Sequence, residues 1–317
     1  MRPIVALTIA LAALAASPNT LAQAFPSKPV HIFVGVPPPA APDIVARLFA
    51  KELEKELGQP FVVENRVGAN STLAAKAVVG AAPDGYTLFL GSPINISPVF
   101  LRNNAVDAGK ELSPISRVYT SPFMVFVTAK QPFKSWGDIV SYAKANPGKA
   151  NFGTVASLTT LLMSVLKTRS DINYTVVPYK ANADLIKAMT VGDVDFTVLT
   201  PPPFLSSIQA GTVRPLFGTQ RFALLPNVPA AADVGIANFD LVTNGGIWAP
   251  RDTPADVVQK LSASVAKAAK APEIVEPSRK NFGLDIVSTT PAEEMRNFEK
   301  EMRFWQDAAR AAKFEPE

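Results

Sequence analysis

The sequence predicts an α/β fold with a parallel sheet, because of its first βαβ segment and the alternation that follows it. An apolar run over residues 30–36 leads through a proline-rich loop into a helical pattern over residues 44–57. Gly58 and Pro60 separate that helix from a second apolar run at residues 61–63. Strand, helix and strand in this order form the crossover unit of a parallel sheet. Apolar runs and helical stretches then alternate along the chain, which is the pattern of α/β proteins.

Later strands and the length of the chain predict more than one α/β unit. We expect further strands at residues 87–90, 123–128, 174–177, 194–199 and 213–218. About 290 residues follow an N-terminal signal, which is more than one compact core usually holds. We therefore expect two domains.

Three helix starts are marked by capping residues. Ser135-Trp136-Gly137-Asp138 has a hydroxyl at the N-cap and an acid three residues later, which is a capping box. Thr253-Pro254 and Thr290-Pro291 each place Thr at the N-cap and Pro at the first helical position, again with an acid in the first turn. The last two predict alanine-rich helices over about residues 254–270 and 291–312, whose role is packing.

Residues 1–24 are typical of an export signal. Arg2 gives a short positive region, residues 4–16 are apolar, and Ala22-Gln23-Ala24 offers the small residues that signal peptidase requires. The apolar stretch is shorter than the roughly 20 residues that a membrane-spanning helix needs. We expect export, with cleavage near Ala24.

The sequence lacks the residues of a catalytic or metal site. It has no cysteine, and its single histidine, His31, lies inside the first apolar run, which is typical of a core or sheet-edge position. It contains no phosphate loop, dinucleotide fingerprint, nucleophile elbow or Cys/His metal spacing. The formal net charge of +4 comes from interspersed acidic and basic residues, which gives no footprint for nucleic acid. We expect no catalysis, no cofactor, no metal and no nucleic-acid partner.

Two proline clusters mark the loops where a ligand is expected. They are residues 37–39 with Pro42, and residues 201–203, and each follows an apolar strand and precedes a helix. Loops of this kind lie at the carboxyl ends of strands, where α/β proteins bind ligands, and a helix N-terminus favours an anion. Proline stiffens such a loop or simply ends the strand. Its repetition in two equivalent settings favours a cleft wall.

Several short phrases, each weak alone, are specific in their order and spacing. They are Phe25-Pro26-Ser27-Lys28-Pro29-Val30, Asp43-Ile44-Val45-Ala46-Arg47, Gly58-Gln59-Pro60-Phe61-Val62-Val63-Glu64-Asn65-Arg66, Ala81-Ala82-Pro83-Asp84-Gly85-Tyr86-Thr87-Leu88, Pro178-Tyr179-Lys180, Leu225-Pro226-Asn227-Val228-Pro229, Ala249-Pro250 and Thr253-Pro254. Together they resemble the Bug/TctC family, the extracytoplasmic solute-binding proteins of tripartite tricarboxylate transporters. The resemblance covers about residues 25–315.

The resemblance implies a type II periplasmic binding protein, with two α/β domains and a ligand cleft between them. The chain would cross between the domains twice, so that residues 25–122 and 240–317 form domain 1 and residues 123–239 form domain 2. The protein would be a monomeric periplasmic receptor that captures a small organic acid for integral membrane transporter subunits. In such proteins backbone N–H groups and hydroxyls of two loops hold a ligand carboxylate.

Three loops depart from the family pattern by losing glycines. They are residues 38–43, residues 67–71 and residues 154–159, and Leu162 stands where histidine is usual. Lost glycines limit how closely a backbone approaches a ligand, and Val155, Leu158 and Leu162 together indicate a cleft that is less polar than the family norm. These changes favour a monocarboxylate or an aromatic acid over citrate. They also leave open an exported sensor or chaperone-like protein that presents its ligand to a membrane signalling partner, and less so an exported hydrolase.

Ten residues in these loops and at strand ends are the candidate ligand contacts. They are Pro39, Ala40, Ala41, Asp43, Ser71, Ser92, Thr154, Ser157, Thr159 and Thr200. The hydroxyls among them would donate hydrogen bonds to the ligand, although a strand-end hydroxyl is otherwise an ordinary turn or cap residue. Asp43 either caps the first helix or faces the cleft, where it would repel a second carboxylate.

Overall fold

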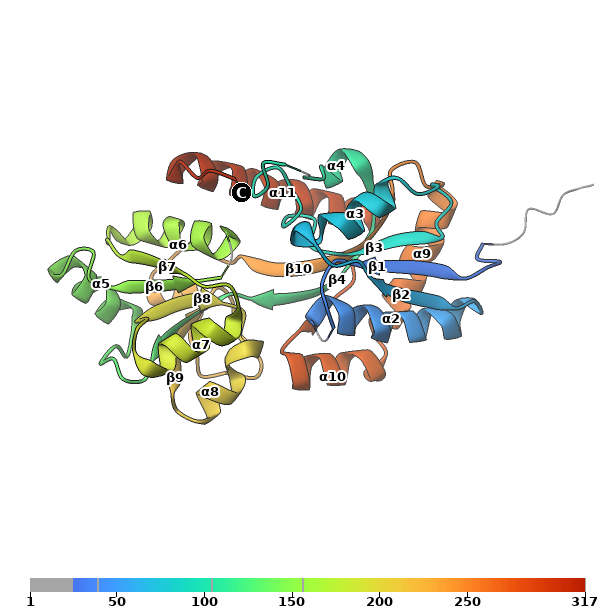
Figure 1. Ribbon diagram of the computed structural model, residues 1–317. Helices are drawn as coiled ribbons and strands as arrows, with labels where there is room; N and C mark the ends of the chain where they lie inside the picture. The colour runs from blue at the N-terminus through green and yellow to red at the C-terminus, as the bar shows by residue number, and fades with distance from the viewer. Residues whose placement is uncertain (1–24, 39, 104, 156, 317) are drawn as a thin grey trace, which may run out of the picture.

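Two sheets, each covered by helices, divide the molecule into two lobes (Figure 1). The structure is a computed structural model that describes residues 25–38, 40–103, 105–155 and 157–316. Lobe 1 contains β1 (Val30–Val34), α2 (Ala41–Leu57), β2 (Phe61–Asn65), η1 (Ala69–Ser71), α3 (Thr72–Val79), β3 (Thr87–Gly91), α4 (Ala108–Glu111), β4 (Leu112–Pro122), β10 (Val242–Pro250), α9 (Ala255–Ala268), α10 (Pro272–Phe282), β11 (Asp285–Ile286) and α11 (Pro291–Ala312). Lobe 2 contains β5 (Met124–Thr128), α5 (Trp136–Ala145), β6 (Asn151–Thr154), α6 (Ser157–Ser170), β7 (Thr175–Pro178), α7 (Asn182–Val191), β8 (Phe196–Leu199), η2 (Pro202–Phe204), α8 (Leu205–Gln209), β9 (Val213–Gly218) and η3 (Ala231–Val234). The sheet of lobe 1 has the order β11-β4-β10-β3-β1-β2, and that of lobe 2 has the order β7-β6-β8-β5-β9.

The first three strands confirm the predicted parallel βαβ unit. β1 lies between β2 and β3 and is parallel to both, so that Ile32 is the register partner of Val63 and Leu88. α2 buries a stripe that includes Phe49 and Leu53, both fully inaccessible, and each such side chain contributes about 1.5–3 kcal/mol by burial. The N-terminus of this helix therefore has a fixed place at the carboxyl end of β1.

Two long strands that the sequence did not reveal connect the lobes. β4 and β10 pair antiparallel over their whole length, from Leu112 opposite Pro250 to Pro122 opposite Val242. β4 leads directly into β5 of the second sheet, and β10 brings the chain back to lobe 1 (Figure 1). The chain thus crosses between the sheets twice, while the domain limits at residues 122/123 and 239/240 stay a prediction.

One of the predicted helix starts is displaced. α11 opens as expected, with Thr290 Oγ1 accepting a hydrogen bond from the N–H of Glu293 in a capping box, and α5 opens with the same device. The start predicted at Thr253 is wrong, because α9 begins at Ala255. The hydroxyl of Thr253 instead donates to the carbonyl oxygen of Pro250, 2.8 Å away, and so serves the turn that precedes the helix.

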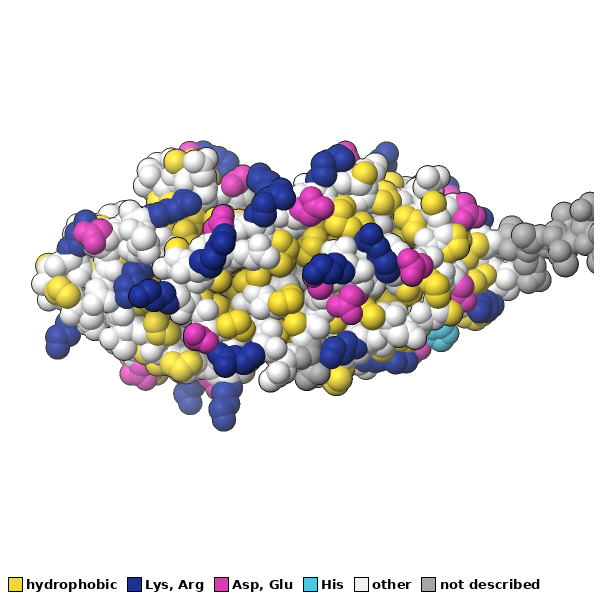
Figure 2. All heavy atoms as spheres, turned by 90° about the horizontal axis from the view of Figure 1, so that it is seen from above, with side chains coloured by type: hydrophobic (Ala, Val, Ile, Leu, Met, Phe, Trp, Pro, Cys, Tyr) yellow, Lys and Arg dark blue, Asp and Glu magenta, His cyan; other side chains and the backbone are white. Residues whose placement is uncertain are grey.

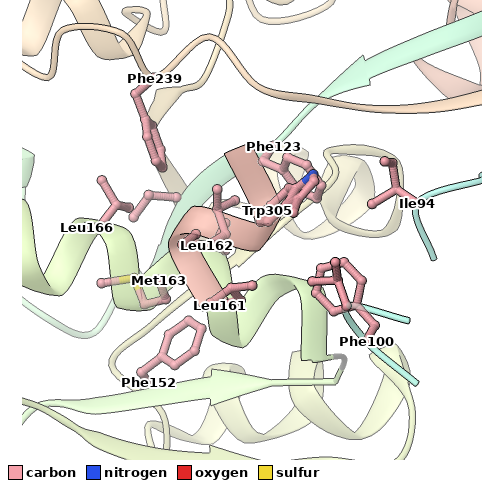
Figure 3. Close-up of a cluster of buried hydrophobic side chains, with 14 of the residues drawn as sticks. Ile94, Phe100, Phe123, Phe152, Leu161, Leu162, Met163, Leu166, Phe239 and Trp305 are labelled. Atoms are coloured by element: carbon pink, nitrogen blue, oxygen red, sulfur yellow. The ribbon is translucent and has the colours of Figure 1, made fainter. Parts of the chain in front are cut away.

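The last helix joins the cores of the two lobes. α11 packs against β4 of lobe 1 and against α6 of lobe 2. Figure 3 shows Trp305 of α11 beside the apolar face of α6, where Leu161, Leu162 and Leu166 are fully buried. Leu162 therefore belongs to this core, and its expected contribution to the cleft wall is wrong.

Candidate ligand-binding site

A cavity of about 490 Å³, which we call cavity A, lies between the two lobes. Lobe 1 lines it with the loop that joins β1 to α2, with the end of β3, and with β4 and β10. Lobe 2 lines it with the start of α7 and the segment between β8 and α8. A volume of this size is typical of small-molecule sites, and the carboxyl ends of β1 and β3 meet there as expected.

A second cavity of about 430 Å³, cavity B, adjoins the first. Gly35, Val36, Ser71 and Asn95 line both cavities. Its remaining walls come from the turn before α3 and from the N-terminus of α6. A larger hollow of about 690 Å³ lies elsewhere, beside α11 and α4, and contains none of the predicted site residues.

Most of the predicted site residues lie around these cavities. Cavity A is lined by Ala40, Ala41, Ser71, Ser92 and Thr200. Ser157 lines cavity B, and with Thr154 it also lines a smaller hollow of about 350 Å³. Thr159 and Asp43 line none of these three cavities. Pro39 lies outside the described residues.

The N-terminus of α2 offers backbone donors to cavity A. The N-cap is Ala40, which has no side chain that accepts a hydrogen bond, and Pro42 has no N–H. Within the described chain, the N–H groups of Ala41 and Asp43 are therefore left for an external acceptor. The helix dipole favours an anion at this position.

The carboxylate of Asp43 is hydrogen-bonded to neighbouring side chains and does not line the cavity. It is 3% exposed and accepts hydrogen bonds from Arg47 Nη2 at 2.9 Å and from Asn65 Nδ2 at 2.8 Å. Asn65 Nδ2 also donates to the carbonyl oxygen of Val36, at 2.9 Å. Asp43 is therefore neither the N-cap, which is Ala40, nor a cleft-facing group. Its contacts fix the loop that forms the cavity wall.

A turn of left-handed residues forms the boundary between the two cavities. Ala69, Asn70 and Ser71 have φ values of 44°, 52° and 74°. Left-handed backbone costs a residue other than glycine roughly 1–2 kcal/mol, and such strain gathers at ligand sites. The turn presses on Gly35, where an added Cβ would lie 2.2 Å from the Cβ of Ser71. Glycine at position 35 therefore allows Ser71 to reach both cavities.

The predicted hydroxyls of lobe 2 contact one another. Thr154 Oγ1 lies 2.9 Å from Thr159 Oγ1 and 3.0 Å from Thr160 Oγ1. Thr154 and Thr159 are buried, at 5% and 3% exposure. These contacts hold the start of α6, which presents Ser157 to cavity B together with the apolar side chains of Val155 and Leu158.

The described residues that line cavities A and B include no charged side chain. His31, the single histidine, lies outside both cavities, with its Nδ1 2.6 Å from Glu64 Oε1. Burial acts to raise the pKa of the Glu64 carboxyl, but hydrogen bonds from His31 and Arg66 bring that pKa below its ordinary value. The described residues contain no cluster of three or more metal-ligating side chains. The cavities can therefore hold an anion through neutral donors and helix N-termini only.

The part of cavity A that comes from the long strands and from α7 is not predictable from local sequence patterns. Tyr119, Ser121, Thr243 and Asn182 line the cavity. The first three lie on β4 and β10, whose apolar alternation is interrupted by Ser, Pro and Gly. Asn182 follows closely after the phrase Pro178-Tyr179-Lys180, which was the one available signal.

Two α/β lobes with a cavity between them define a two-domain solute-binding protein. A family model described as the tripartite tricarboxylate transporter family receptor (TctC) matches residues 45–311, and the chain belongs to this family. It is 34% identical over 278 residues to a UPF0065 protein of Cupriavidus necator, covering 86% of this chain and 84% of that one. It is 30% identical over 290 residues to a UPF0065 protein of Pseudomonas sp. strain P51, covering 90% and 86%.

Solved structures show the same fold. A protein of R. palustris with adipate is 28% identical, with a TM-score of 0.79, and the match covers 92% of this chain and 100% of that one. MatC of Rhodopseudomonas palustris with bound malate is 26% identical, with a TM-score of 0.74 and coverages of 90% and 99%. The predicted type II periplasmic binding fold is thus confirmed. As a member of a family of periplasmic solute-binding receptors, the chain is a binding protein and not an enzyme.

Proposed function

We propose that this chain is the periplasmic receptor for a small organic carboxylate, which it delivers as a monomer to the integral membrane subunits of a tripartite transporter. Cavity A carries the proposal, because both lobes line it with neutral donors and the uncapped N-terminus of α2 opens onto it. Family membership supports the role of receptor. The adipate and malate bound by the two R. palustris proteins support a carboxylate as the ligand.

The preferred ligand is a monocarboxylate or an aromatic acid, ahead of citrate. The described walls of cavities A and B have no cation to neutralise several carboxylates, and a buried carboxylate without partners is costly. Apolar side chains such as Ile44, Leu90 and Phe282 in cavity A, and Val155 and Leu158 in cavity B, would cover a hydrocarbon body. Such burial contributes roughly 25 cal/mol per Å².

Calorimetric titration and thermal-shift measurement on the mature protein test this proposal, with benzoate, terephthalate, adipate and citrate as probes. An acid present at 100 times its dissociation constant should stabilise the fold by about 2.7 kcal/mol. No shift with any acid up to millimolar concentration would overturn the receptor proposal. Citrate binding tenfold tighter than the others, a preference of about 1.4 kcal/mol, would overturn the ligand preference.

Replacing single hydroxyls tests the wall that lobe 2 contributes. Ser157→Ala and Thr159→Ala should each weaken binding of the preferred acid by about 0.5–1.5 kcal/mol, Ser157 by direct contact and Thr159 through its contact with Thr154. Ser206→Ala, an exposed serine of α8, is the control. Unchanged affinity in both variants would remove the start of α6 from the site.

Export to the periplasm and delivery to a membrane partner complete the proposed function. Among the described residues, no helix combines the length and apolarity that a membrane crossing requires. The signal segment and its cleavage point at Ala24 lie outside the described residues. Figure 2 shows Lys and Arg side chains mixed with Asp and Glu over the face that it presents, and the proposed function involves no nucleic acid. Mass spectrometry of the periplasmic protein should find Phe25 at the N-terminus, and light scattering should give a monomer.

A further inference from the structure

The long strands that connect the lobes bring three hydroxyl groups to one side of cavity A. Ser121 of β4 is the register partner of Thr243 of β10, and Tyr119 is the partner of Gly245. Side chains two apart on a strand, and those directly paired across two strands, share a face of the sheet. Tyr119, Ser121 and Thr243 all line cavity A, in agreement with this alternation.

Gly245 gives the Tyr119 ring its position. A Cβ added at Gly245 would lie 2.2 Å from Cε1 of Tyr119 and 2.7 Å from its hydroxyl oxygen. Only glycine leaves room for the ring to lie across β10 at this point. The register shifts directly afterwards, since Gly246 is opposite Arg117, and an irregularity of this kind re-aims the neighbouring side chain.

Two of the three hydroxyls are unpaired in the described chain. Tyr119 is 5% exposed, and neither its hydroxyl nor that of Thr243 has a hydrogen-bond partner among the described residues. Ser121 Oγ makes one long contact, 3.4 Å from the carbonyl oxygen of Gly283. Burial raises the pKa of Tyr119, so its phenol keeps its proton and remains a donor. Thr243 is half-buried, and neither hydroxyl oxygen is among the fully enclosed side-chain atoms that lack a partner, so both are open to cavity A.

We propose that Tyr119 and Thr243 form a subsite for a second oxygen of the ligand, a carbonyl or carboxylate oxygen remote from the carboxylate bound at the start of α2. This inference rests on the proposed function and adds a chemical class to it: the acid carries a second oxygen acceptor. The neutral hydroxyls donate to either kind of oxygen. An acid that lacks the second oxygen would leave both hydroxyls unpaired in a closed site, and sites with buried donors discriminate strongly against such analogues.

Two pairs of acids test the inference without changing ligand charge. Hexanoate is compared with 5-oxohexanoate, and benzoate with 4-acetylbenzoate, by calorimetric titration. The wild-type protein should bind the carbonyl-containing member of at least one pair about tenfold more tightly, as expected for one paired buried donor. Tyr119→Phe keeps the ring beside Gly245 and removes only the hydroxyl. It should abolish most of this preference, because the loss of affinity should fall mainly on the carbonyl-containing acid.

Further variants separate the subsite from a general effect on folding. Thr243→Val should reduce the preference by a smaller factor, because the phenol would still donate. Tyr142→Phe, at an exposed tyrosine of α5, should leave both members of each pair unchanged. Equal binding of both members by the wild-type protein would overturn the inference, as would an equal loss for both members in Tyr119→Phe. The proposed function survives either result, whereas failure to bind any acid overturns both.

Discussion

Two clusters of buried charge support the walls of cavity A, and they differ in how much of their charge reaches solvent. At the start of α2, the buried carboxylate of Asp43 is paired with Arg47, whose side chain is 51% exposed. Between β4 and α11, Arg117 is paired with Glu294 and Glu301, and their side chains are 8%, 0% and 18% exposed. The first cluster has a solvated cation, while the second lies almost entirely in the interior.

The difference shows what each cluster can tolerate. Arg117 donates from Nε to Glu294 at 3.0 Å and from Nη1 to Glu301 at 2.8 Å, and Glu301 also accepts from Asn244 Nδ2 at 2.9 Å. This network ties β4, β10 and α11 together, and water has little access to replace a lost partner. Arg47, in contrast, already contacts water. Neither cluster points a carboxylate into cavity A, so the neutral groups there face the ligand without competition.

Removing the cation of the interior cluster should have the largest effect on stability. Arg117→Met leaves the carboxylates of Glu294 and Glu301 without their cation in a mostly buried cluster, and we expect a loss of about 3–5 kcal/mol in the free energy of unfolding. Urea denaturation measures it, with Arg303→Met, at an exposed arginine of α11, as the control. A loss below about 1 kcal/mol would mean that the interior cluster is no more sensitive than a surface pair.

Removing a charge from the solvated cluster should reduce stability less than removing Arg117 from the interior cluster. Asp43→Asn removes one charge but leaves Arg47 free to interact with water, so a loss of about 1–2 kcal/mol is expected. Because the carboxylate does not line cavity A, affinity for the acid should stay within about threefold. Thermal denaturation and titration of the same variant give both values. A large gain in affinity would show that Asp43 faces the ligand after all.

The smallest effect should be the pH dependence of stability that Glu294 of the interior cluster contributes. Burial raises the pKa of the Glu294 carboxyl above its usual 4.5, although Arg117 opposes the rise. A carboxyl with a raised folded-state pKa adds stability below about pH 4.5, and this contribution is lost as the pH rises through the folded-state pKa. The free energy of unfolding of the wild type minus that of Glu294→Gln should therefore fall between pH 4 and pH 7. Glu299→Gln, at an exposed glutamate of the same helix, controls for the loss of one charge. A difference that grows over this range would contradict the prediction.

Local patterns were enough to predict the elements whose burial follows a simple period. β1, α2 and β2 are recognisable within thirty-odd residues from their apolar runs and from the glycine that ends α2. The capping box of α11 is a four-residue signal. β4 is buried on both faces, and it includes Ser116, which accepts a hydrogen bond from the N–H of Thr289, and Arg117, which is paired with Glu294. Both partners lie more than 170 residues further along the chain. Because these polar residues interrupt the apolar pattern, the sequence does not predict β4 as a strand.

The candidate site divides in the same way. The β1–α2 loop, Ser92 and Thr200 are predictable, because each directly follows an apolar strand and strand ends gather at one edge of a sheet. Tyr119 and Thr243 were missed because their meeting depends on the pairing of two strands more than a hundred residues apart. The role of Asp43 stays open between helix cap and cleft on sequence alone, because the sequence does not show that Arg47 and Asn65 converge on its carboxylate.

The position of β10 has a consequence for how the chain folds as it is made. β3 and β4 are consecutive in sequence, but β10 lies between them in the sheet, so the edges of β3 and β4 that pair with β10 stay unpaired until residue 250 is available. Every strand of the second sheet lies between residues 124 and 218 and has no such dependence. Since domains generally fold as units, lobe 2 is able to form first. The final quarter of the chain then closes lobe 1 from its centre outward, and the Tyr119 and Thr243 pair is among the last parts of the molecule to come together.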